Sequence, residues 1–136
     1  GRLQTSTVSG TTTTYLYSGA ELIAEYDGSG ALLRRYVPGP SLDDFVAWYE
    51  GAGTSDRRWL IADELGSVIA STNSSGAALS VVRGRPDAWT GPRFAYAGAI
   101  TLPEAQLYHM RARAYAPGLG RFAQADPILH AGGMNL

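Results

Sequence analysis

Two arginines and one aspartate near the C-terminus are the residues of this chain best placed to act on one another. Arg111 and Arg113 lie in segment 107–115, whose side chains alternate as in a β-strand and put both arginines on one face. The sequence at 116–118, Ala-Pro-Gly, predicts a tight turn that leads the chain back toward Asp126. On residue types alone, a carboxylate beside guanidinium groups favours a structural salt bridge over a catalytic pair.

The composition predicts that short strands position these residues. The chain has 136 residues, 45% of them hydrophobic, and 17 glycines, with apolar runs too short for long helices. Such a pattern is typical of strands joined by tight turns, and one domain with a modest core fits this length. We therefore expect an all-β fold.

An internal repeat supports this expectation. Residues 21–36 align with residues 67–82 at an offset of 46, and six positions are identical. In each copy an apolar strand leads through a polar turn, at 27–30 or 73–76, into a second strand. Because a single hairpin is marginal in water, we expect the copies to stack into one extended sheet.

The connector at 37–59 is less regular. Pro38-Gly39-Pro40 predicts a break. The residues after it are compatible with two structures: an elaborated loop, or a capped helical turn with Ser41, Asp43 and Asp44 at its start and Phe45, Val46 and Trp48 along it.

Several ordered motifs resemble the RHS repeat-associated core domain and its YD repeats. The residues that carry the likeness are Arg93-Phe94-Ala95-Tyr96-Ala97-Gly98, Leu107-Tyr108, Arg111-Ala112-Arg113, Gly120-Arg121-Phe122 and Asp126-Pro127-Ile128. A YD-like pattern also spans 15–36, and Leu65-Gly66-Ser67-Val68 is similar to the family's HLGSV element. The resemblance implies three parts: an exposed N-terminal segment at 1–14, two YD-type hairpin repeats with an irregular connector at 15–90, and the C-terminal part of the RHS-associated core at 91–136.

The family resemblance also implies a function. YD-type hairpins would form an extended, curling sheet, part of a β-shell that encloses a C-terminal toxic segment, and the core domain would release that segment by aspartate-dependent self-cleavage. Asp126 matches the first aspartate, Arg113 matches the arginine of the site, and Arg111 is a supporting residue. The family's second aspartate motif is absent, and one carboxylate cannot serve as both acid and base. We expect this chain alone to be proteolytically inactive and its parent to be an aspartate-type autoprotease.

Three departures from the family pattern affect local geometry. Gln106 replaces a glycine, Ala116 replaces an aspartate before proline, and Leu129-His130 follows the Asp-Pro motif where the family continues with glycine.

Other classes of activity find little support. The formal net charge is -1, and twelve acidic residues offset eleven arginines, so nucleic acid is not an expected partner. Without cysteine, and with His109 and His130 lacking spaced partners, the sequence predicts neither a metal site nor a cofactor. No apolar run reaches the roughly 18 residues of a membrane span.

The expected partners are therefore the rest of an RHS shell and its toxic segment, in a bacterial protein that is secreted, held at the cell surface or delivered by a contact-dependent system. We expect the chain to be a piece of a larger polypeptide. Two alternatives remain open: a scaffold that self-associates through strand edges, and a carbohydrate-binding module that uses its recurring tyrosines and tryptophans.

Overall fold

The computed structural model describes residues 2–41, 44–81, 93–94, 98–110 and 113–123. These residues form two antiparallel sheets without an α-helix, so the expected all-β class is confirmed. The eight strands of the first sheet follow one another in chain order: β1 (Thr5–Val8), β2 (Thr11–Ser18), β3 (Glu21–Asp27), β4 (Leu32–Pro38), β5 (Phe45–Glu50), β6 (Arg57–Ala62), β7 (Val68–Thr72) and β8 (Ala78–Val81). The second sheet, in the order β12-β11-β10-β9, contains β9 (Ile100–Leu102), β10 (Leu107–Met110), β11 (Arg113–Ala116) and β12 (Arg121–Phe122).

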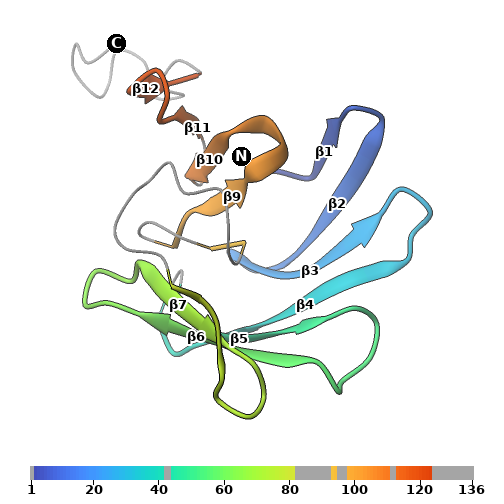
Figure 1. The fold of residues 1–136 in the computed structure, drawn as a ribbon. Coiled ribbons are helices and arrows are strands. Elements are labelled where there is room, and N and C mark those ends of the chain that lie inside the picture. Colours follow the sequence, from blue (N-terminus) through green and yellow to red (C-terminus); the bar gives the residue numbers. More distant parts are fainter. Residues whose placement is uncertain (1, 42–43, 82–92, 95–97, 111–112, 124–136) are drawn as a thin grey trace.

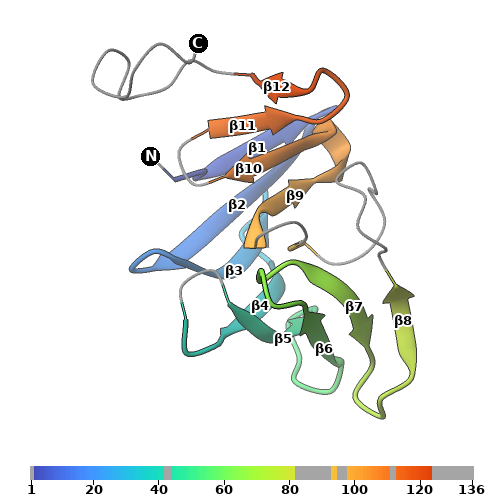
Figure 2. The same ribbon diagram turned by 90° about the vertical axis from the view of Figure 1, so that its left-hand side faces the viewer.

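The large sheet is strongly curved. Strands β1 to β7 curl around β9, which lies on the concave side (Figure 1). From the side, β8 forms one edge of the large sheet, and β10 to β12 lie close to β1 and β2 (Figure 2). Strand β9 therefore packs into the hollow of the large sheet, and β10 to β12 continue beside its first two strands.

Both hairpins predicted from the internal repeat are present. In the first loop the Asp27 carboxylate accepts hydrogen bonds from the backbone N–H groups of Ser29 and Ala31, both at 2.9 Å. Asn73 accepts the matching bonds from Ser75 and Ala77 in the second loop. A third loop of this kind follows Asp63, whose carboxylate binds the N–H groups of Leu65 and Ser67.

In each loop the fourth residue is a glycine with a positive φ. The values are 85° at Gly30, 76° at Gly66 and 89° at Gly76. A side chain would strain the backbone there, which explains the recurring glycine.

The repeat is larger than the sequence suggested, because each copy is a unit of four strands. In both units a bulge removes one residue from the ladder, Ile23 between β2 and β3 and Ile69 between β6 and β7. A second bulge leaves Leu33 or Leu79 unmatched in the following hairpin. Strands β1 to β4 therefore correspond to β5 to β8, and the pairing of β4 with β5 joins the two units.

The hydrophobic core lies between the concave face of the large sheet and the start of the second sheet. The large sheet contributes Tyr15, Leu22, Tyr36, Phe45, Trp48, Leu60 and Val68, and the segment from residue 94 onward contributes Phe94, Ile100 and Leu102. The burial of apolar area on one face explains why the two sheets pack together.

Two predictions of local structure were wrong. Phe45, Val46 and Trp48 lie in β5 rather than in a loop or a helical turn, because β5 pairs with β4 and β6 on both sides. Segment 107–115 is not one strand, since β10 and β11 pair antiparallel with Met110 opposite Arg113. The turn predicted at 116–118 is present and leads from β11 into β12.

The segment 1–14, which we expected to be an exposed end, contains β1 and the start of β2. Its side chains are largely exposed, yet its backbone pairs from Thr5↔Thr14 to Val8↔Thr11. Alternation in a Thr-rich run gives no apolar signal, so the strands were not apparent from the sequence.

Candidate functional site

The most unusual residue of the concave face is a fully buried glutamate in β3. Glu25 has a side-chain exposure of 0%. The bulge at Ile23 places Glu25 on the same face as Leu22, three residues away, and opposite Tyr15 of β2. A regular strand would have directed the two side chains to opposite faces.

Four donors converge on the Glu25 carboxylate. Oε1 accepts hydrogen bonds from Nε of Arg93, at 2.9 Å, and from the Tyr36 hydroxyl. Oε2 accepts from Arg93 at 3.0 Å and from Arg34 at 3.2 Å. We refer to Glu25, Arg34, Tyr36 and Arg93 as the Glu25 cluster.

The Glu25 cluster joins distant parts of the chain, because Arg93 is 68 residues away from Glu25. Arg93 binds the carboxylate with two nitrogens and donates with a third to the carbonyl of Thr101, at 2.9 Å. This paired geometry suits guanidinium and is beyond a lysine ammonium. Arg93 also lies 3.5 Å from a carboxylate oxygen of Glu104.

The neighbouring Phe94 completes the contact. Its ring stacks on Phe45, with centroids 3.7 Å apart, and meets the ring of Tyr36 edge-on at 4.8 Å. The guanidinium of Arg93 lies 5.9 Å from the ring centroid of Tyr15. An arginine and the aromatic residue after it are thus held by one carboxylate and three aromatic rings of the large sheet.

A chain of ion pairs extends from the cluster across the sheet. Arg34 lies 3.0 Å from Glu50, and Glu50 is followed by Arg58 at 3.7 Å. The indole N–H of Trp48 donates to Glu50 at 2.9 Å. In the ladder Glu25 is opposite Arg34, and Arg34 is opposite Glu50, so cross-strand pairing sets the order of charges.

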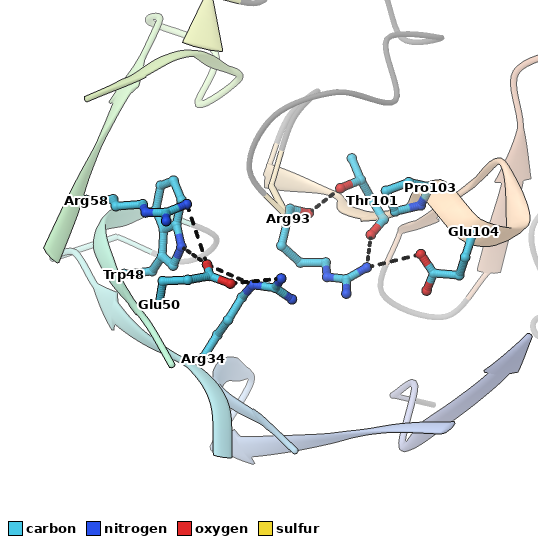
Figure 3. A pocket seen from close by; sticks show the side chains of 8 residues that line it. All are labelled: Arg34, Trp48, Glu50, Arg58, Arg93, Thr101, Pro103 and Glu104. Atoms are coloured by element: carbon cyan, nitrogen blue, oxygen red, sulfur yellow. Dashed lines mark hydrogen bonds and ion pairs between the residues drawn. The ribbon is translucent and has the colours of Figure 1, made fainter. Parts of the chain in front are cut away.

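These side chains face a polar cavity of about 330 Å³ between the two sheets (Figure 3). It is lined by Arg34, Trp48, Glu50, Arg58, Arg93, Thr101, Pro103 and Glu104. Each lining arginine already contacts a carboxylate, so the cavity offers no uncompensated positive charge to an anion.

Burial and pairing shift the pKa values of this region. Burial, reinforced by the charge of Glu25, raises the pKa of Tyr36 well above its usual value. Burial alone would lower the pKa of Arg93, but the charge and hydrogen bonds of Glu25 raise it instead. Tyr36 therefore stays neutral as a donor and Arg93 stays charged.

This arrangement fits docking rather than acid–base catalysis. A carboxylate has about four lone-pair positions, and four donors occupy those of Glu25. The side chain has no exposed surface through which a substrate could approach. Its chemistry is the recognition of an arginine.

The residues proposed from sequence for self-cleavage lie elsewhere. Arg113 is in β11, where its guanidinium lies 3.8 Å from the ring centroid of Phe122. Asp126 and Arg111 lie outside the described residues, so their proximity to Arg113 stays a prediction.

Little in the sequence indicates the Glu25 cluster. Arg93 belongs to the motif that resembles the RHS core, and no local pattern around Glu25 or Arg34 indicates a site. The one sequence signal of the cluster is that Leu22 and Glu25 are out of phase for a regular strand, which becomes meaningful only when the bulge is known.

The aromatic residues described in the strands are mainly packing groups. Tyr15, Tyr36 and Trp48 are buried, and Trp59 is partly covered by the guanidinium of Arg57 at 4.8 Å. In the described part of the chain, no group of three or more His, Asp or Glu residues is arranged to hold a metal ion, and no helix is long and apolar enough to cross a membrane.

No protein-family model matches the chain, and no curated protein matches it.

Proposed function

We propose that this chain is a structural segment of an RHS-type bacterial toxin shell, exported or delivered by contact, whose curved sheet helps to enclose a C-terminal toxic segment. The motifs of residues 93–128 and the YD-like hairpins motivate this assignment. In this function the large sheet is a segment of the shell wall, and the second sheet belongs to the core domain that closes the shell.

The observation that carries the proposal is the docking of Arg93 and Phe94 on the concave face. They are the first two residues of the motif that resembles the RHS-associated core, and they bind Glu25 and Phe45 of the repeat sheet. A closing element must be positioned on the inside of its wall, and a buried carboxylate that accepts several hydrogen bonds from one arginine selects that position.

The form of the sheet also supports the proposal. Its eight strands follow chain order and are built from two equivalent units, so further units can be added without changing the existing ones. In this interpretation Asp126 and Arg113 contribute the first half of a self-cleavage site.

The test is protease protection of the complete polypeptide encoded by the reading frame that contains this chain. We expect the segment after residue 136 to resist added protease until the sheet is unfolded by denaturant, and Asp126→Asn to abolish its release while leaving protection intact. The matched control, Asp56→Asn, changes an exposed carboxylate of the sheet and should leave release unchanged.

Two results would overturn the proposal. One is digestion of the downstream segment at the same rate in native and denatured protein. The other is a reading frame with no segment after the core motif.

A further inference from the structure

The two edges of the large sheet have a relation that follows from its four-strand repeat. Strands β1 and β8 are its edge strands, and each pairs on one side only among the described residues. β8 is the counterpart of β4, and β1 is the counterpart of β5. Within the chain, β4 and β5 pair with each other.

We propose that β8 of one chain pairs antiparallel with β1 of a second copy, in the register of the internal β4·β5 joint. The internal joint shows that the outer side of a β4-type strand accepts a β5-type strand in this curved sheet. The occupant is a second copy because the same chain presents the complementary edge. This inference concerns the edges and does not depend on a toxin shell.

The repeat fixes the register. In the joint, Arg34 is opposite Glu50 and Arg35 is opposite Tyr49. Ser80 occupies the position of Arg34, since Ser71↔Ser80 in the second unit repeats Glu25↔Arg34 in the first.

The corresponding positions in β1 follow from its pairing with β2. Thr7↔Thr12 corresponds to Tyr49↔Arg57, which makes Val8 the counterpart of Glu50. Ser80 should therefore lie opposite Val8 of the second copy, and Val81 opposite Thr7 of that copy.

The composition of the edges is compatible with pairing. β8 contains no charged residue and no proline, and its side chains Leu79 and Val81 are 49% and 64% exposed. Edge strands that avoid pairing with another chain usually carry a charged residue or a proline, and β8 has neither. β1, with the sequence TSTV, is uncharged as well.

The pairing is head-to-tail. A chain that uses β8 toward one neighbour still has β1 for the next, so assembly continues unless the curvature closes a ring. We expect a concentration-dependent series of oligomers.

Cysteine cross-linking tests the register directly, because the chain contains no cysteine. Gly51 donates to the carbonyl of Leu33, which makes the adjacent Arg34–Glu50 pair a non-hydrogen-bonded one. Such pairs have Cα atoms about 4.5 Å apart, within the usual range for a disulfide. Val8→Cys combined with Ser80→Cys should therefore give disulfide-linked dimers and larger species on mild oxidation.

The matched control combines Thr7→Cys with Ser80→Cys. It retains the change at Ser80 and shifts the partner by one residue, so the second thiol lies on the other face of the sheet. We expect at least a tenfold lower yield of linked species. Equal yields from the two variants, or no linked species from either, would overturn the proposed register.

A second experiment tests the edge without cysteines. In the register of the internal β4·β5 joint, the N–H of Val81 points away from β7 and toward the added strand. Val81→Pro removes this donor, so it should abolish the oligomers seen by light scattering. The circular dichroism spectrum should stay unchanged. Val81→Thr, which keeps the N–H, should still assemble. A wild-type chain that stays monomeric at millimolar concentration, or a proline variant that assembles equally well, contradicts the proposal.

Discussion

The two four-strand units share a backbone pattern and differ in the side chains at one cross-strand pair of positions, of which one member is buried. The first unit has the ion pair of Glu25 and Arg34, at 3.2 Å. The second has Ser71 and Ser80, whose hydroxyl oxygens lie 2.6 Å apart. Loops and bulges set the same register in both units, so the chemistry of the inner face can change without altering the ladder.

The comparison shows that the residues that bind Arg93 differ from those that set the strand register of the sheet. Arg93 binds the first unit because that unit has a buried carboxylate at the position where the second has a hydroxyl. A buried ion pair often adds little net stability, because the cost of desolvation offsets the attraction. Its value here is selectivity, since a guanidinium placed against Ser71 would lose its charge partner.

The largest expected effect comes from neutralising the acceptor in the first unit. Glu25→Gln leaves the buried charge of Arg93 with only the partly exposed Glu104 as an ionic partner, and we expect a loss of about 3 kcal/mol in the free energy of unfolding measured by urea denaturation. Glu104→Gln is the control: Glu104 is partly exposed and 3.5 Å from Arg93, so its loss should cost under about 1 kcal/mol. Equal losses in the two variants would show that Glu25 has no special role.

A smaller effect should follow from changing the shape of the donor. Arg93→Lys keeps the charge but cannot bind both oxygens of Glu25 and the carbonyl of Thr101, and we expect a loss of about 2 kcal/mol. Hydrogen exchange should also speed up at the amide of Thr101, which donates to the carbonyl of Arg93. Arg58→Lys, at a more exposed ion pair, should leave that amide unchanged.

The second unit should respond more weakly. Ser71→Ala removes one hydroxyl of a neutral pair, and we expect a cost of about 1 kcal/mol. Adding Ser80→Ala should cost less than the sum of the two single changes, because the pair is already broken. Fully additive losses would show that the two hydroxyls do not stabilise each other.

The smallest expected effect is a difference in the acid dependence of stability between the equivalent loops at 27–30 and 73–76. The side-chain hydrogen bond from Ser29, together with backbone N–H groups, lowers the pKa of Asp27 below its value in the unfolded chain. Its contribution to stability is therefore present above about pH 4 and is lost as the pH falls through the folded-state pKa.

Asp27→Asn should remove this part of the acid dependence, because Asn73 makes the same bonds in the second loop without titrating. Urea denaturation at pH 2.5 and pH 6 checks the expectation. An unchanged difference between the two pH values in the variant would show that other carboxylates cause the acid dependence.

The parts of the fold that could be predicted from the sequence are those with local signals. The hairpins at 21–36 and 67–82 have apolar strands and Asx-Gly loops, and both were found. The full four-strand unit was not predicted, because β1 and β5 occupy equivalent positions in the ladder but have dissimilar sequences, TSTV and FVAWYE. The expectation of a loop or a helical turn at 45–48 failed because local capping residues were outweighed by the ladders on both sides of β5.

The candidate site was beyond sequence reasoning for a different reason. Glu25 and Arg93 are brought together by the curvature of the sheet and by the packing of Phe94 on Phe45, neither of which leaves a short-range pattern. Residues near the C-terminus were proposed instead because their motif is contiguous.

The bulge at Ile23 lets β3 hold one residue more than a regular ladder would. Deleting that isoleucine would leave Leu22 and Glu25 two residues apart, and a regular strand would then keep both side chains on the concave face. The fully buried carboxylate thus keeps its place in a strand of either length. Variation by a single codon at this point leaves the inner face of the sheet unchanged.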